Sequence, residues 1–205
     1  MEELIQILQK PLQQKEVEVA DLPDLDLYMD QITTLFADKT QEPEGLLTKT
    51  MINNYSKDGL IKPIKGKKYS KEHMLLLIFI YYFKNILCIN DLHHILDPLV
   101  EKYFSSEDDL NLTGIYNEVF SLEKDEVQYL AKDITKKFNR SKETFKDAPE
   151  EERESLQYFS LICMLSFDTF LKKMIIEKMI DLDRAKQTPE DTHGKKSSRA
   201  KKNQP

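Results

Sequence analysis

Apolar residues recur at helical spacing along most of the chain, and the first clear helix covers residues 24–40. Its apolar positions fall about one turn apart on a single face, which is the pattern of an amphipathic helix packed on a core. Asp24 or Asp26 is expected to cap this helix, and Pro43 and Gly45 are expected to close it. The residues of the apolar face are Leu27, Tyr28, Ile32, Leu35 and Phe36.

A second helix is predicted to open at Thr48, whose hydroxyl can accept hydrogen bonds from first-turn N–H groups that have no partner within the helix. Met51, Ile52 and Tyr55 are its inward positions, and polar and basic residues lie mostly on the opposite side. Gly59 is expected to end the helix, because glycine readily adopts the positive φ that closes many helices. The helix therefore has one apolar face and one polar, basic face.

The segment "IKPIKGKKY" that follows is short and basic, and it predicts a tight β-hairpin or loop with Gly66 near its tip. Ser70 is then expected to start a helix that runs to about Asn85. This helix is apolar on almost every side, so it should lie at the centre of the fold. Its apolar run, Met74–Phe83, is too short to cross a membrane, which takes roughly 20 residues. We therefore expect a cytoplasmic protein without a membrane span.

Four further helices are predicted in the second half of the chain. The first should be capped by Asn90 or Asp91, and Pro98 should kink or divide it, because proline removes a helical hydrogen bond. Two more are expected near residues 109–119 and 122–138. These short elements alternate with polar segments and extend the helical pattern.

The last helix is expected to begin at Pro149 and to run to about residue 183. Its middle, "YFSLICMLSFDTFL", is apolar on every side, so either the other helices wrap it or it supplies a subunit interface. Residues 184–205 contain no large apolar side chain and many basic ones, which predicts a disordered basic tail. Residues 1–19 are interpreted as a short N-terminal arm.

Charge is distributed unevenly along the chain. The whole chain has a net charge of −6, yet the stretch from Leu46 to His73 holds seven lysines against Asp58 and Glu72, a local charge of +5. Clustered lysines of this kind are typical of surfaces that contact the phosphates of nucleic acids. A solvated surface loop is the other explanation for such a charge run.

The composition argues against an enzyme. The chain has five glycines, and it shows no glycine-rich phosphate cradle, nucleophile–base pair or metal-ligand spacing. His93 and His94 project about 100° apart on a helix, so they are expected to be structural and not to share a metal ion. Cys88 and Cys163 lie in apolar runs and are expected to be buried, reduced thiols. We expect neither a cofactor nor a metal.

Helix, turn, helix, basic hairpin and helix, in that order, is the layout of a winged helix-turn-helix. One helix of such a domain reads base edges in the major groove, while lysines of the hairpin neutralise phosphates. Residues 48–58 would be the recognition helix and residues 62–69 the wing. The residues predicted to contact DNA are Thr48, Lys49, Asn53, Asn54, Lys57, Lys65, Lys67, Lys68 and Tyr69, of which Tyr69 is also a candidate packing residue.

The segments "MINNYSKDGLIKP" and "KGKKYSKEHMLLLIFIYYFK" resemble the DNA-binding domain of MerR-type regulators. The positions that match the family's pattern are Ile52, Tyr55, Gly59, Leu60, Ile61, Pro63, Lys68, Tyr69 and Ser70. Asn53 and Asn54 stand where that family usually has Arg and Tyr, and an asparagine can bond adenine bidentately. Roughly residues 20–170 also resemble a bacterial family of unknown function, number 1836.

Together the pattern and the resemblance predict an all-α protein. Residues 20–100 would form a MerR-like winged helix-turn-helix with a small basic β-hairpin, followed by a helical extension over residues 101–183. The resemblance implies a homodimer that binds double-stranded DNA, with the extension used for dimerisation or for an effector, either a small molecule or a protein. No cysteine-rich metal loop follows, which argues against metal sensing. The alternative function is a non-enzymatic helical adaptor that binds protein partners on a degenerate MerR-like scaffold.

Overall fold

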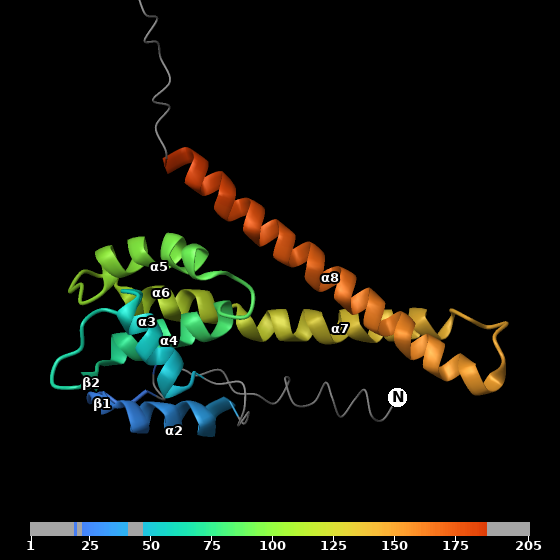
Figure 1. The fold of residues 1–205 in the computed structure, drawn as a ribbon, viewed down its shortest axis with the longest axis horizontal. Coiled ribbons are helices and arrows are strands. Elements are labelled where there is room, and N and C mark those ends of the chain that lie inside the picture. Colours follow the sequence, from blue (N-terminus) through green and yellow to red (C-terminus); the bar gives the residue numbers. More distant parts are fainter. Residues whose placement is uncertain (1–18, 20–21, 41–46, 188–205) are drawn as a thin grey trace, which may run out of the picture.

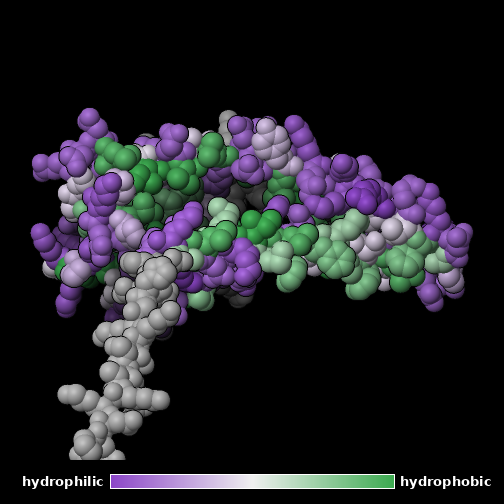
Figure 2. All heavy atoms as spheres, turned by 90° about the horizontal axis from the view of Figure 1, so that it is seen from above, coloured by the Kyte–Doolittle hydropathy of each residue, from purple (hydrophilic) through white to green (hydrophobic). Residues whose placement is uncertain are grey.

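A computed structural model describes residues 19, 22–40 and 47–187 of the 205-residue chain. The protein is mostly helical, with one small antiparallel sheet (Figure 1). A globular body is followed by an arm of two long helices, along which a band of hydrophobic residues is exposed (Figure 2). Among the helices described, none is both long enough and apolar enough to cross a membrane.

The prediction of a mainly helical fold is confirmed, and the structure also has one two-stranded antiparallel sheet. The elements of the body are β1 (Leu27–Tyr28), α2 (Met29–Thr40), α3 (Lys49–Lys57), β2 (Lys68–Tyr69), α4 (Lys71–Phe83), α5 (Ile89–Tyr103) and α6 (Leu112–Phe120). The elements of the arm are α7 (Glu123–Lys142) and α8 (Glu150–Gln187).

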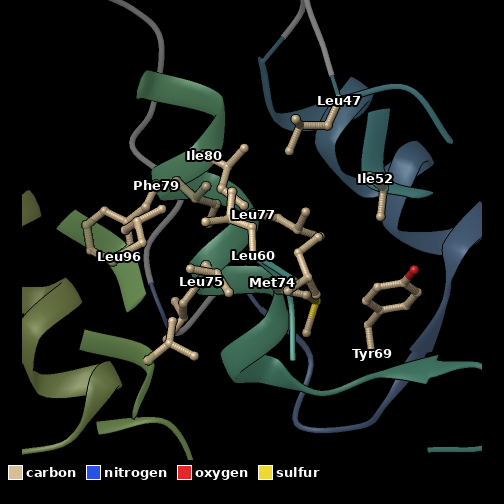
Figure 3. Close-up of a cluster of buried hydrophobic side chains, with 14 of the residues drawn as sticks. Leu47, Ile52, Leu60, Tyr69, Met74, Leu75, Leu77, Phe79, Ile80 and Leu96 are labelled. Carbon is tan, nitrogen blue, oxygen red and sulfur yellow. The ribbon is translucent and has the colours of Figure 1, made fainter. Parts of the chain in front are cut away.

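Helix α4 forms the centre of the body, as its apolar sequence predicts. Every residue from Met74 to Ile80 is buried. Ile52 of α3 and Tyr69 of β2 lie on one side of α4, and Leu96 of α5 lies on the other (Figure 3). Because burying a large apolar side chain contributes about 1.5–3 kcal/mol, this continuous buried run holds α3, the sheet and α5 in fixed positions around α4.

The sheet differs from the predicted hairpin. Strand β2 pairs with β1, which precedes α2 in the chain, and Tyr28 lies opposite Lys68. Within the wing itself a single bridge joins Lys65 to Lys68. Because Leu27 and Tyr28 are extended, α2 begins at Met29 and not directly after the aspartates that were expected to cap it. The wing is therefore anchored to an N-terminal strand.

Helix α3 has the two ends that the sequence predicts. The Thr48 hydroxyl accepts a hydrogen bond from the Met51 N–H at 3.2 Å. Gly59 follows the helix with a φ of +89°, and a Cβ at this position would meet nothing within 4 Å. A substitution at Gly59 is therefore opposed by backbone strain and not by a steric clash.

Replacing Gly59 by Ala should lower the free energy of unfolding by about 1–2 kcal/mol, the usual cost of placing an L-residue in the left-handed region. Gly114→Ala is the matched control, because Gly114 lies within α6 and its Cβ would come no closer than 3.8 Å to another atom. That control should be neutral or stabilise by up to about 1 kcal/mol. Urea denaturation of both variants measures the difference, and equal effects would contradict the role of φ.

The first turn of α5 also departs from the prediction. Cys88 is the N-cap of the helix, so Asn90 and Asp91 lie inside its first turn. Cys88 is exposed and Cys163 is partly exposed, so the expectation that both thiols are buried was wrong. The Cys88 thiol donates to the Asp91 carboxylate at 3.0 Å. Cys88 is the cap of α5 and Cys163 lies within α8, so apolar neighbours in the sequence did not ensure that either thiol is buried.

Of the two outcomes predicted for Pro98, a kink or a division of the helix, the division does not occur. The helix is continuous from Ile89 to Tyr103, and Pro98 lies on its exposed side. Leu96 and Val100, which flank the proline, are buried in the core. Packing of these neighbours offsets the helical hydrogen bond that proline removes.

Helices α7 and α8 run antiparallel as the arm (Figure 1). Gln157, which is buried, donates to the carbonyls of Lys142 at 3.0 Å and Thr144 at 3.1 Å and so ties the connecting loop to α8. Further along, the Lys137 ammonium of α7 lies 3.2 Å from the Asp168 carboxylate of α8. These polar contacts fix how the two helices are aligned.

The end of α8 leaves α7 and packs on the body. Ile180 is buried, and Ile176 packs against the same core. The helix continues to Gln187, so Arg184–Gln187 are helical and do not belong to the predicted disordered tail. The rest of that tail and the predicted N-terminal arm, apart from residue 19, lie outside the described residues.

Within the described residues, much of the surface of α8 is exposed, so the other helices do not wrap it. Phe167 and Phe170 are each 65% exposed. Figure 2 shows a band of exposed hydrophobic residues along the arm. The exposed large apolar residues of α8 are Tyr158, Phe159, Ile162, Phe167, Phe170, Leu171, Met174, Ile175, Met179 and Leu182.

Candidate nucleic-acid interface

The outer face of α3 carries polar residues that the sequence singled out. Asn53, Asn54 and Lys57 are exposed, because the fully buried Ile52 fixes the opposite face of the helix in the core. Thr48 and Lys49 are also exposed, at the start of the helix. These side chains give α3 a surface rich in hydrogen-bonding groups and positive charge.

Lys49 differs from the other predicted contacts, because its ammonium forms an ion pair with the Asp30 carboxylate of α2. Both side chains are largely exposed, so the pair contributes little to stability. It does offset the charge of Lys49 at the start of α3. Lys57 at the opposite end of the helix is the basic residue of its last turn.

The tip of the wing is a two-residue turn formed by Gly66 and Lys67, whose φ angles are 58° and 61°. The Lys68 N–H donates to the Lys65 carbonyl across the turn at 3.0 Å. Positive φ at both central residues is the geometry of the tight turns that join β-hairpins. Lys65 and Lys67 are exposed at this tip.

The two residues that follow the turn serve a different purpose. Lys68 is half-buried, and its ammonium lies 5.2 Å from the centre of the Tyr28 ring, within range of a cation–π interaction. Tyr69 is only 2% exposed. Burial raises the pKa of Tyr69, although a hydrogen bond with Ser56 of α3 acts in the opposite direction. Tyr69 therefore offers no surface to DNA and instead packs the wing against α3.

His73 ties the start of the wing to α4. Its Nδ1 accepts a hydrogen bond from the Ser70 N–H at 3.1 Å, and its Nε2 lies 3.2 Å from the Lys62 carbonyl. Burial lowers the pKa of His73, which favours the neutral ring with its proton on Nε2, where it can donate to Lys62. Together, His73 and Tyr69 hold both ends of the wing.

The sequence pattern did not indicate that Tyr28 and His73 belong to this region. Tyr28 is 51% exposed and lies beside Lys68, but its spacing placed it on the apolar face of a helix. His73 has a sequence signal, because it stands three residues after Ser70, at the position whose side chain can bond back to the cap of a helix.

His93 and His94 contact different elements, as their helical spacing predicts. The Nδ1 of His93 lies 2.9 Å from the Asp97 carboxylate, and its Nε2 lies 3.4 Å from Asp58. Burial acts to lower the pKa of His93, but its contacts with Asp97 and Asp58 outweigh burial and raise that pKa. His94 lies 2.9 Å from Asp183. Within the described part of the chain, no cluster of three or more residues is arranged to bind a metal ion.

These features define a mostly helical protein with an exposed polar helix beside a lysine-bearing turn. Residues 17–119 match the family model described as "Domain of unknown function (DUF1836)". This match covers half of the chain, so the protein belongs to that family. It spans the body from β1 nearly to the end of α6. No curated protein and no solved structure matches the chain.

Proposed function

We propose that this protein is a sequence-specific DNA-binding transcriptional regulator with a MerR-like winged helix-turn-helix. The observation that carries the proposal is that two exposed polar or basic surfaces lie on elements that Tyr69 packs together. One comprises Asn53, Asn54 and Lys57 on α3, and the other comprises Lys65 and Lys67 at the tip of the wing. The buried tyrosine of β2 joins the two, so they would meet a ligand as one rigid unit.

Each surface suits a different part of a duplex. The side chains of Asn53 and Asn54 can form paired hydrogen bonds with adenine edges in the major groove. Lys57, Lys65 and Lys67 can neutralise phosphates, which fixes the position of the protein on DNA without reading its sequence. Recognition would therefore come from α3, and much of the affinity from the wing.

Two further observations support this assignment. The body contains helix, helix, wing and helix in the order expected of a winged helix-turn-helix. The protein as a whole has a net charge of −6, so attraction to a polyanion requires a local basic surface, and the wing supplies one. An acidic protein with this arrangement would approach DNA in one preferred orientation.

The test is to sequence genomic fragments that the purified full-length protein retains at physiological salt. We expect enrichment of a shared motif with approximate two-fold symmetry, because a homodimer would read two half-sites. The Asn53→Ala/Asn54→Ala variant should retain fragments with weaker preference for the motif. Retention without any shared motif, or no retention, would overturn the proposal of a sequence-specific regulator.

We also propose that the regulator is a homodimer that pairs through α8. The apolar residues Phe159, Phe167, Phe170 and Met174 lie within about 80° of one another around the helix, so they form one stripe. Helix α8 has 38 residues and is about 57 Å long. The stripe from Phe159 to Met174 covers about 22 Å of this length, so a stable interface of roughly 1,600 Å² would also bury the neighbouring exposed apolar residues of α8.

A two-fold axis across the middle of α8 would place the apolar stripe of one copy against the same stripe of the second copy. Such a self-complementary contact closes on itself and gives a dimer.

A protein–protein adaptor is the second candidate function. The exposed apolar face of α8 and the pairing of Lys49 with Asp30 favour it. An adaptor would bind a different polypeptide through α8 and would show no retention on DNA at physiological salt. The fragment-retention experiment therefore separates the two functions.

A further inference from the structure

The first turns of α5 meet two elements that are far apart in the sequence. On one side, His93 faces Asp58, which is the C-cap of α3. On the other side, His94 faces Asp183 near the end of α8, at 2.9 Å. Adjacent helical residues project about 100° apart, which allows α5 to contact both neighbours from consecutive positions.

The contact between α5 and α8 has a polar part and an apolar part. We call the polar part, formed by the pairs Arg184–Asp91 and His94–Asp183, the polar clasp. The apolar part is Ile180, which we call the apolar anchor. The Arg184 guanidinium donates to the Asp91 carboxylate at 2.7 Å and to the Asn90 carbonyl at 3.1 Å. The hydrogen bond from the Cys88 thiol is the main cause that holds the pKa of Asp91 below its usual value, and Arg184 lowers this pKa further. The carboxyl of Asp91 therefore stays ionised. Next to the clasp, Ile180 is only 6% exposed. The clasp therefore binds the last turns of α8 to one turn of α5.

The contact between α5 and α3 lies at the end of the proposed recognition helix. The N–H of Asp58 donates to the Asn54 carbonyl at 2.9 Å, which closes the last turn of α3. The carboxylate of the same residue faces His93, and Asp97 on α5 orients the ring of that histidine. Movement of α5 thus acts on the turn of α3 that carries Asn54 and Lys57.

We propose that α5 couples the docking of α8 to the end of α3, so that the arm regulates the DNA-reading surface. In this arrangement His93 is a positioning residue that acts through Asp58. Docked α8 holds the first turns of α5, and α5 holds the last turn of α3. The consequence for DNA affinity rests on the proposed function, whereas the mechanical coupling does not.

The test uses the full-length Asp183→Ala/Arg184→Ala variant, which removes the polar clasp and keeps the apolar anchor. Amide hydrogen exchange is measured without DNA over α8 and over residues 54–60. We expect exchange to rise about two- to thirtyfold in residues 176–187 and also in residues 54–60, because coupling between distant sites is commonly of this size. DNA affinity should fall by a similar factor.

Two comparisons make the result specific. The Lys173→Ala/Glu177→Ala variant removes another ion pair, one whose two partners both belong to α8, and it should leave residues 54–60 unchanged. His93→Ala should raise exchange in residues 54–60 alone, and adding the clasp substitutions to it should raise that exchange no further. If the His93 and clasp substitutions instead have additive effects on exchange in residues 54–60, the coupling between α8 and α3 does not pass through His93.

Faster exchange in α8 with no change at α3 would overturn the coupling. Unchanged exchange in α8 itself would overturn the role of the clasp in docking. Coupled exchange in a protein that retains no DNA would support the coupling and contradict the proposed function. The two proposals therefore fail in distinguishable ways.

Discussion

Reversing the charge of both exposed wing lysines, in the Lys65→Glu/Lys67→Glu variant, should lower the affinity of the protein for duplex DNA by about tenfold or more. Each lysine that neutralises a phosphate releases a counterion, so losing two contacts should reduce the slope of log affinity against log salt by about 1.8. Both side chains are exposed at the tip of the wing, so the fold should be unaffected. Fluorescence anisotropy of a labelled duplex over a range of salt concentrations measures both quantities.

The Lys132→Glu/Lys136→Glu variant is the matched control, because these two lysines are exposed on α7 of the arm and their reversal changes the net charge equally. We expect its affinity to fall only slightly and its salt slope to stay the same as that of the wild type. Equal losses in the two variants would mean that total charge, and not contact by the wing, determines binding. An unchanged slope in the wing variant would contradict phosphate contact at Lys65 and Lys67.

Much of the body could be predicted from the sequence, because its signals are local. The apolar run of α4 indicated a central helix, and the structure buries Met74–Ile80. Thr48 and Gly59 marked the ends of α3, because capping depends on residues close in the sequence. The phase of α3 was also predictable, since Ile52 fixes which side faces the core.

The sheet and the continuity of α5 through Pro98 could not be predicted in the same way. Strand β1 has two residues, which is too short for an alternating pattern, and its partner β2 lies beyond two helices. Pro98 has a strong local preference against a helix interior, but packing of Leu96 and Val100 overrides it. In both cases contacts between distant segments determined the structure.

The candidate interface also combines features that the local sequence predicts with features that depend on contacts between distant segments. The exposure of Asn53, Asn54 and Lys57 follows from helix phase, whereas the burial of Tyr69 depends on how the wing packs against α3. The ion pair of Lys49 with Asp30 joins two helices that no sequence pattern aligns. Residue types therefore indicated the chemistry of the surface, and tertiary packing determined which members of the set remain available.

The Phe167→Glu/Phe170→Glu variant should be a folded monomer in place of the proposed dimer. Both rings are 65% exposed in the single chain, so the substitutions remove little that stabilises the monomer. A dimer would bury both rings from each copy, and burial of a large apolar side chain contributes about 1.5–3 kcal/mol. We expect the dissociation constant to rise at least about a thousandfold, which corresponds to about 4 kcal/mol. Sedimentation equilibrium and far-UV circular dichroism measure assembly and folding.

The Leu25→Glu/Leu110→Glu variant is the control, because it places the same charges at apolar residues that are 62% and 54% exposed outside α8. This control should sediment like the wild type, at twice the 24.1 kDa mass of one chain. A dimer that survives both substitutions in α8 would place the interface on another surface. A wild-type chain that is monomeric at every concentration would contradict the homodimer, and the apolar stripe of α8 would then be a surface for a different polypeptide, as the adaptor function requires.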